Sequence, residues 1–192
     1  MEERISIKRE NVMNAYKQAT EEQKALLENM FGNDMFQPKN IMERVKTFED
    51  ACEVLGEEHS YVQEYRGVAN INFDFTQDII AYLKLRIICE ALNEGWKPQY
   101  TEKEYRWCPW FRLWTEEELN DKSEEWKTDN KLLLFGGSSN DGSFCGLTCA
   151  YTADVVSLAN ADQSARLSVK SEELAAYFGK QFIDIWSDYL FG

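Results

Sequence analysis

The stretch from Asp74 to Gly95 constrains the fold of this chain more than any other. Apolar residues recur there at every third or fourth position, the spacing of one helix face, and further apolar residues widen that face. The residues of this stripe are Ile79, Ile80, Leu83, Ile87, Ile88, Ala91 and Leu92. Gly95 and Pro98 mark the end of the helix. The pattern therefore predicts a long helix, starting near Asp74 or Thr76, with a broad apolar face to bury.

Capping signals predict further helices in the first third of the chain. A helix is expected over 11–19, and Thr20 with Gln23 forms a capping box that opens a second helix over 21–31. Asn40 and Glu43 repeat that spacing. They precede a single apolar stripe that ends at Gly56 and consists of Ile41, Val45, Phe48 and Cys52. The polar, weakly periodic stretch 57–70 is predicted to be a mobile loop.

The last third of the chain shows strand signals. Segments 131–135, 144–151 and 165–169 predict a small antiparallel sheet, with the glycine-rich residues 136–143 as a hairpin connection. Ser171 then caps a final helix. Its core-facing stripe consists of Leu174, Phe178, Phe182, Ile185 and Tyr189.

Together these elements predict an α+β fold with N-terminal helices, a small late antiparallel sheet and a C-terminal helix packed on it. The chain of 192 residues suits a single domain, with residues 1–39 as a candidate helical appendage to a core of residues 40–192.

The charge balance excludes several classes of function. There are 21 basic and 34 acidic residues, a formal net charge of −13, which repels nucleic-acid phosphates and anionic membranes at long range. No secretory signal or membrane span is recognisable in the sequence, and the odd count of five cysteines suggests buried, reduced thiols. We expect a cytoplasmic protein, with neither membrane contact nor direct nucleic-acid binding as its main activity.

Signatures of catalysis are weak. His59 is the only histidine, in the predicted loop, so any histidine-dependent hydrolysis would depend on that one residue. Cys145 and Cys149 lie in a predicted strand with a spacing too long for a shared metal or a disulfide. The glycines at 136–137 follow an apolar strand but lack the Lys-Ser/Thr of a phosphate loop. We therefore predict no catalytic residues, no metal site and no cofactor, and expect the protein not to be an enzyme.

The acidic segment 115–130 is the first candidate site. It contains seven acidic and two basic residues. Such a segment is either a solvated helical face or a row of carboxylates that imitates a phosphate backbone and fits a basic groove on a protein partner. The candidate partner-binding residues are Glu116, Glu117, Glu118, Asp121, Glu124 and Glu125.

The aromatic segment 96–114 is the second candidate site. Aromatic faces beside arginine stack nucleobases or grip another protein, but they also fill cores. Residues 107–111 are expected to pack inward, with Arg106 and Arg112 on the surface. The candidate ligand-binding residues are Arg106, Trp107, Trp110, Arg112 and Trp114.

Several strings resemble an uncharacterised family from tailed bacteriophages, prophages and mobile elements of gut bacteria. The strings are 41–52 (IMERVKTFEDAC), 91–98 (ALNEGWKP), 110–111 (WF), 164–167 (SARL) and 170–182 (KSEELAAYFGKQF). The acidic segment and the glycine-rich loop fall outside the shared pattern. The resemblance implies a mobile-element origin and action inside a bacterial host cell, without any catalytic residue set.

The leading hypothesis from the sequence is a non-catalytic, phage-type accessory protein that binds a protein partner with a basic surface. An acidic, nucleic-acid-mimicking inhibitor of a host defence nuclease is the sharpest form of that hypothesis. A nucleotide or single-stranded nucleic-acid binder that uses residues 96–114 is the alternative from another class. A virion component and an enzyme with a carboxylate-bound metal are weaker alternatives.

Overall fold

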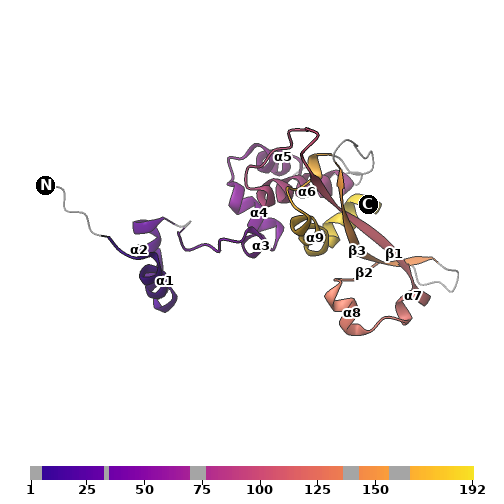
Figure 1. Ribbon diagram of the computed structural model, residues 1–192, viewed down its shortest axis with the longest axis horizontal. Coiled ribbons are helices and arrows are strands. Elements are labelled where there is room, and N and C mark those ends of the chain that lie inside the picture. Colours follow the sequence, from indigo (N-terminus) through magenta and orange to yellow (C-terminus); the bar gives the residue numbers. More distant parts are fainter. Residues whose placement is uncertain (1–5, 33–34, 70–76, 136–142, 156–164) are drawn as a thin grey trace. The chain divides into compact units, whose positions relative to one another are not determined.

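The structure combines α-helices with a three-stranded antiparallel sheet (Figure 1). The computed structural model describes residues 6–32, 35–69, 77–135, 143–155 and 165–192. Ten α-helices and three strands lie within these ranges, so the predicted α+β class is confirmed. The chain divides into two compact units, Met1–Asn40 and Ile41–Gly192, and each is described by itself below.

The first unit contains α1 (Arg9–Gln18) and α2 (Glu21–Phe31), close to the predicted helices. Thr20 and Gln23 form the predicted capping box at the start of α2. The ring of Tyr16 stacks on that of Phe36, with 4.1 Å between centroids. Val12 and Phe36 are the buried apolar side chains of this unit, so its core is small.

The core of the second unit forms around α6 (Gln77–Asn93), the helix that the broad apolar stripe predicted. Neighbouring helices pack on it: α3 (Ile41–Arg44), α4 (Phe48–Leu55), α5 (Ser60–Ala69) and α10 (Ile183–Phe191). Leu85, Ile87, Ile88 and Leu92 are fully buried on α6, whereas Ile79 near its start is 47% exposed. The predicted start at residues 74–76 lies outside the described residues.

Two predictions for residues 41–70 are wrong. The stripe from Ile41 to Cys52 is buried as expected, but it spans two helices, because Thr47 and Asp50 form a capping box that starts α4 anew. The predicted mobile loop is instead largely α5. Only Val62 of α5 is buried, so its apolar periodicity is too weak to recognise from the sequence.

The sheet differs from the predicted one because it contains a strand that was not predicted, β1 (Arg106–Thr115), and because the segment 131–135 contributes only two strand residues. The strand order is β1–β3–β2, with β1 antiparallel to β3 (Phe144–Val155), and β2 (Leu133–Leu134) pairing only with Leu147 and Gly146. Most of β1 falls in the aromatic segment 96–114, for which no strand was predicted. Its position at the sheet edge tolerates Pro109, which has no N–H to donate to a ladder.

The predicted strand over 165–169 is also wrong. Ala165–Leu167 forms a short 3₁₀-helix, and only Val169 joins the sheet, through one bridge to Trp107. The two residues exchange backbone hydrogen bonds of 3.0 and 2.9 Å. The predicted glycine-rich connection at 136–142 lies outside the described residues.

The C-terminal helix packs on the sheet as predicted, but it is two helices. α9 (Glu172–Gln181) starts at Ser171, whose hydroxyl accepts the Leu174 N–H, and α10 begins after Phe182, where the backbone leaves helical geometry. α9 lies against β1 and β3, and Phe178 and Trp186 join the core beneath them.

The capping box of α4 gives a prediction on stability and pH. Asp50 accepts the backbone N–H groups of Lys46 and Thr47 at 2.9 Å each. Burial raises the pKa of Asp50, but these hydrogen bonds outweigh it and the pKa lies below its usual value. A carboxylate with a depressed pKa stabilises the fold above its unfolded pKa, about 3.9, and that stabilisation is lost as the pH falls further.

We therefore expect Asp50→Ala to cost about 1 kcal/mol at pH 7 and much less near about pH 3. Urea unfolding at both pH values measures this. Glu49→Ala is the matched control, because Glu49 is an exposed neighbour in the same first turn. An equal loss in both variants would show that charge near the helix start, and not the cap, is responsible.

Candidate functional site

The acidic segment forms two short helices at one end of the sheet, away from α4, α5 and α6 (Figure 1). α7 (Glu116–Asn120) begins with a capping box between Thr115 and Glu118, and α8 (Glu124–Asp129) begins at Ser123, whose hydroxyl accepts the Trp126 N–H at 3.1 Å. Acidic residues in the first turn stabilise a helix N-terminus, which explains why they occur at these positions.

Two basic side chains around these helices pair with carboxylates of the same region. Arg112 pairs with Glu118 at 3.0 Å, and its guanidinium lies 3.7 Å from the ring centroid of Trp114. Lys127 pairs with Glu124 at 2.7 Å.

Lys122 is held by two aromatic rings. Its Nζ lies 5.2 Å from the rings of Trp114 and Trp126, which meet edge to face. The positive charges of Arg112, Lys122 and Lys127 therefore lie against aromatic rings or against Glu118 and Glu124.

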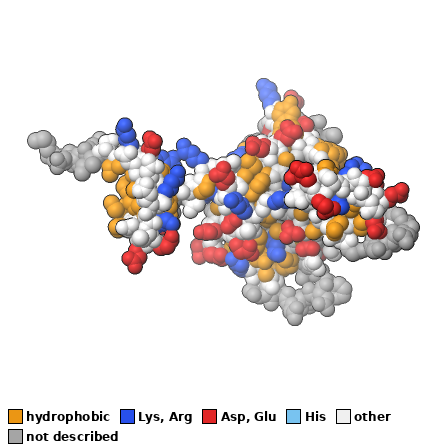
Figure 2. Space-filling model, turned by 90° about the horizontal axis from the view of Figure 1, so that it is seen from below, with side chains coloured by type: hydrophobic (Ala, Val, Ile, Leu, Met, Phe, Trp, Pro, Cys, Tyr) orange, Lys and Arg blue, Asp and Glu red, His pale blue; other side chains and the backbone are white. Residues whose placement is uncertain are grey.

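The remaining carboxylates of the segment face solvent. They are Glu116, Glu117, Asp121, Glu125 and Asp129. None of the five has a cation within ion-pair distance among the described residues. We call these five residues the acidic surface. Acidic and basic side chains also occur together on the face shown in Figure 2. The segment 115–130 contributes −5 of the net charge of −13 within only 16 residues, so the acidic surface is a local concentration of a charge excess that the rest of the chain shares.

Glu118 has a different role from its neighbours. The Thr115 N–H donates to its carboxylate, and this hydrogen bond together with Arg112 lowers the pKa of Glu118. Glu118 and Glu124 are therefore partly engaged in capping and ion pairs. Of the six acidic residues proposed from the sequence, Glu116, Glu117, Asp121 and Glu125 remain available to a partner. Asp129 was not among the predicted residues.

The aromatic candidates do not form one surface. Arg106 is only 4% exposed, beside Glu104 at 3.5 Å and over the ring of Tyr100, so the prediction that it lies on the surface is wrong. Trp107 packs against the core, and Trp114 is buried and donates to Thr148 at 2.9 Å.

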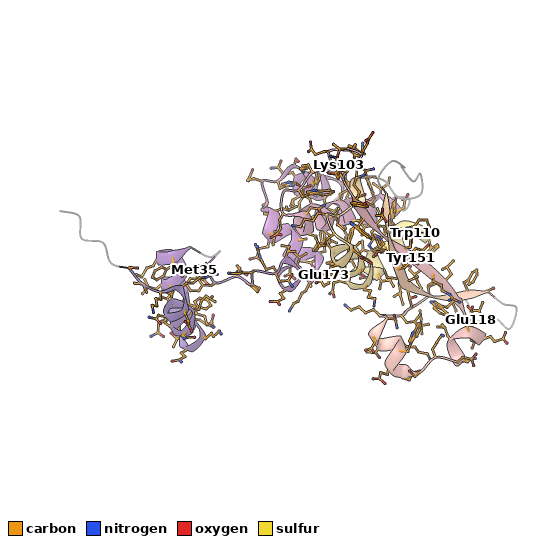
Figure 3. All side chains as sticks on the ribbon, viewed as in Figure 1. Met35, Lys103, Trp110, Glu118, Tyr151 and Glu173 are labelled. Atoms are coloured by element: carbon orange, nitrogen blue, oxygen red, sulfur yellow. The ribbon has the colours of Figure 1, made fainter. Side chains whose placement is uncertain are left out.

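Trp110 pairs with a residue that the sequence did not single out. Its ring is parallel to that of Tyr151 on β3, with 5.7 Å between centroids, and the two lie side by side in Figure 3. Arg112, the expected phosphate contact, is occupied by Glu118 and Trp114. The arrangement therefore offers a partly exposed aromatic pair without a free arginine beside it.

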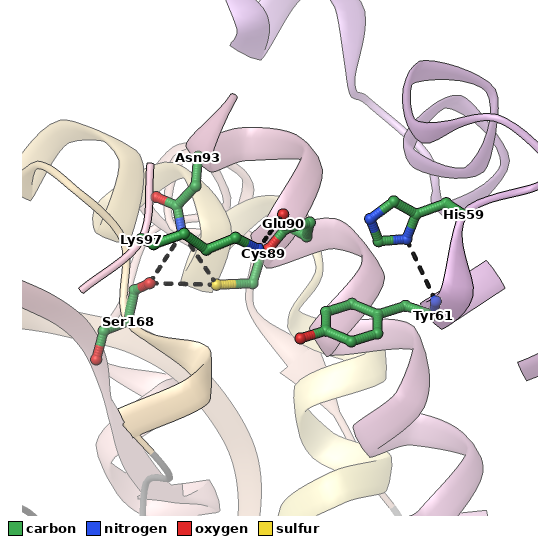
Figure 4. A network of polar contacts seen from close by, with 7 residues as sticks. All are labelled: His59, Tyr61, Cys89, Glu90, Asn93, Lys97 and Ser168. Carbon is green, nitrogen blue, oxygen red and sulfur yellow. Dashed lines mark hydrogen bonds and ion pairs between the residues drawn. The ribbon is translucent and has the colours of Figure 1, made fainter. Parts of the chain in front are cut away.

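His59 and the cysteines have structural surroundings. The His59 Nδ1 accepts the Tyr61 N–H at 3.3 Å at the start of α5 (Figure 4). Asn93 donates to the Ser168 carbonyl at 3.0 Å, and the Cys89 thiol donates to the same carbonyl. Burial raises the pKa of the Cys89 thiol far above neutral, so it stays protonated. This network joins α6 to the segment that carries the Val169 bridge.

Within the described ranges, no three His, Cys, Asp or Glu side chains gather closely enough to hold a metal ion. Among the helices described above, none has both the length and the hydrophobicity to cross a membrane.

Comparisons of the chain with protein-family models, with curated proteins and with solved structures found no match.

Proposed function

We propose that this is a non-catalytic binding protein that docks a basic surface of a protein partner through its acidic surface. The observation that carries the proposal is the separation of charge in residues 112–129. Arg112, Lys122 and Lys127 are held by rings and carboxylates, while five carboxylates face solvent without a cation among the described residues.

Such a surface acts mainly on the rate of association. Unpaired carboxylates attract a basic surface over about one Debye length, roughly 8–10 Å at physiological salt, and so speed encounter. The partner class that fits best is a protein whose basic groove normally holds nucleic-acid phosphates. The sharpest form of this proposal is that the partner is a host defence nuclease, with the acidic surface competing for its groove.

The test neutralises four residues of the acidic surface at once. The variant carries Glu116→Gln, Glu117→Gln, Asp121→Asn and Glu125→Gln. Partners are captured from lysate of a gut bacterium that carries related prophages, at about 50 and about 500 mM salt, and identified by mass. We expect a nucleic-acid-binding protein to be captured at low salt, to be lost at high salt, and to bind the variant at least about tenfold more weakly.

A control variant changes the net charge by the same amount elsewhere. It carries Glu43→Gln, Glu53→Gln, Glu102→Gln and Asp184→Asn, all exposed positions outside α7 and α8. Equal loss of binding in both variants would assign the effect to total charge and contradict a localised site. A partner that stays bound to the first variant, or that does not release at high salt, would also overturn the proposal.

A further inference from the structure

A groove runs between β3 and α9, apart from the acidic surface. Its volume is about 600 Å³. Four consecutive strand residues line one side, Cys149, Ala150, Tyr151 and Thr152. Because successive side chains of a strand point to opposite faces, four in a row line a groove only if it follows the edge of the strand. The other side consists of Ser171, Glu172, Glu173, Ala176 and Lys180.

The strand edge that faces this groove lacks a neighbouring strand in the part of the chain that the structure describes. β1 pairs with β3 along its whole length on one side. On the other side β2 pairs only with Gly146 and Leu147. From Thr148 to Asp154, the backbone groups on that side therefore have no described strand to pair with. An exposed edge of this kind is a template for an added strand.

The groove has an acidic end and a basic end. At one end Glu172 accepts a long hydrogen bond of 3.5 Å from the Thr152 hydroxyl, with Glu173 exposed beside it. At the other end Lys180 follows Gly179, which meets Cys149, and both Lys180 and Cys149 line the groove. β3 and α9 thus run in opposite directions along the groove.

The two ends are separated by a definite length. Residues 172 and 180 are about 12 Å apart along a helix axis, and this equals about three to four residues of an extended chain. Tyr151 lines the strand side of the groove, and its ring stacks on that of Trp110. Tyr151 and Glu173 are both labelled in Figure 3.

We propose that this groove binds an extended segment of a partner protein as an additional strand on β3, with a Lys or Arg of that segment at Glu172 and Glu173. An acidic residue of the same segment, four positions away and so on the same face of the added strand, pairs with Lys180. Charge complementarity selects this occupant, since Glu172 and Glu173 favour a cation at one end of the groove and Lys180 favours an anion at the other.

The floor of the groove supports binding and not chemistry. Burial raises the pKa of the Cys149 thiol to about 11, although Lys180 acts in the opposite direction, so the thiol stays protonated at neutral pH. Ala176 is a small residue in the middle of the helical side and leaves room for side chains of an added strand. The inference is independent of the acidic surface, which lies on other elements.

The experiment selects binders from a displayed library of random peptides about ten residues long, with the full-length protein as bait. We expect enrichment of β-branched and aromatic residues, with a basic and an acidic residue four positions apart. A selected peptide is then synthesised with N-methyl groups on alternate backbone amides. Methylation on the set that faces β3 should abolish binding, whereas methylation on the opposite set should be tolerated, because only one edge of an added strand donates to its neighbour.

Variants of the protein locate the bound peptide. Glu173→Lys and Ala176→Arg should each weaken binding at least about tenfold, the first by repulsion and the second by filling the groove. Asp184→Lys is the matched control for charge, because Asp184 is exposed on α10 outside the groove. Circular dichroism confirms that each variant is folded. The fourfold variant of the acidic surface should bind the peptide normally, so failure of either proposal leaves the other intact.

Several outcomes would overturn the inference. The first is a peptide selection that enriches no charged pair and no strand-forming residues, and the second is an equal effect of methylation on both sets of amides. The third is peptide binding that survives Glu173→Lys and Ala176→Arg. The fourth is a dimer in solution that pairs the β3 edges of two copies.

Discussion

Gly179→Ala is expected to destabilise the protein by about 1–3 kcal/mol, although alanine is the better helix former. Gly179 lies within α9 at the point where the helix meets the sheet. A Cβ at this position would sit 2.5 Å from the Sγ of Cys149 and 2.6 Å from the Cβ of Pro109. Real Cβ atoms do not approach other atoms so closely, so α9 must move away from β1 and β3. Gly179 is therefore present because of this close approach of helix and sheet.

Gly67→Ala makes the same substitution in α5, where nothing lies within 4 Å of the added methyl group. There the propensity of alanine decides, and we expect a stabilisation of about 0.5–1 kcal/mol. Urea unfolding of the two variants measures both effects. Because the expected signs are opposite, a destabilised Gly67→Ala or a neutral Gly179→Ala would show that helix–sheet packing does not control these positions.

Gly179 also has consequences for the groove. The close contact of α9 with Cys149 and Pro109 at Gly179 holds the helix against the sheet between the groove residues Ala176 and Lys180. A displaced helix would change the width of the groove. Gly179→Ala should therefore weaken peptide binding even at temperatures where the variant is fully folded, whereas Gly67→Ala should leave it unchanged.

The parts of the fold that could be predicted are those specified by neighbours in sequence. The capping box at Thr20 and the stripe of α6 depend on residues within a few positions of one another, and both were found where expected. α5 was missed because it buries only Val62 and rests on the core through half-buried tyrosines. β1 was missed because Pro109 interrupts its pattern and is tolerated only at a sheet edge, which depends on the order of the strands.

The candidate site shows the same division. The exposure of Glu116, Glu117 and Glu125 follows from a local excess of charge that is visible in the sequence. Lys122 lies near the rings of Trp114 on β1 and Trp126 on α8. No local sequence pattern reveals that these two elements meet. The groove beside β3 depends on a neighbouring strand, β2, that is only two residues long. Such an edge is recognised only when the pairing of all described strands is known.

Trp186 is the residue whose loss should cost most. It is fully buried, and its ring packs against those of Phe178 at 5.0 Å, Phe111 at 5.2 Å and Tyr189 at 6.0 Å. It thus joins α9, α10 and β1. Trp186→Ala removes these contacts and leaves a large cavity, so we expect a loss of about 3–5 kcal/mol. Urea unfolding followed by circular dichroism measures it without dependence on the other tryptophans.

Trp186→Phe separates the packing of this ring from its polar atom. The indole Nε1 is buried and has no hydrogen-bond partner among the described residues, which costs free energy in the native state. Phenylalanine removes that donor and keeps most of the ring, so the gain offsets much of the lost volume. We expect Trp186→Phe to cost about 1 kcal/mol or less. A loss as large as that of Trp186→Ala would mean that the N–H is satisfied, for instance by a buried water, and that the indole is held there by a hydrogen bond as well as by packing.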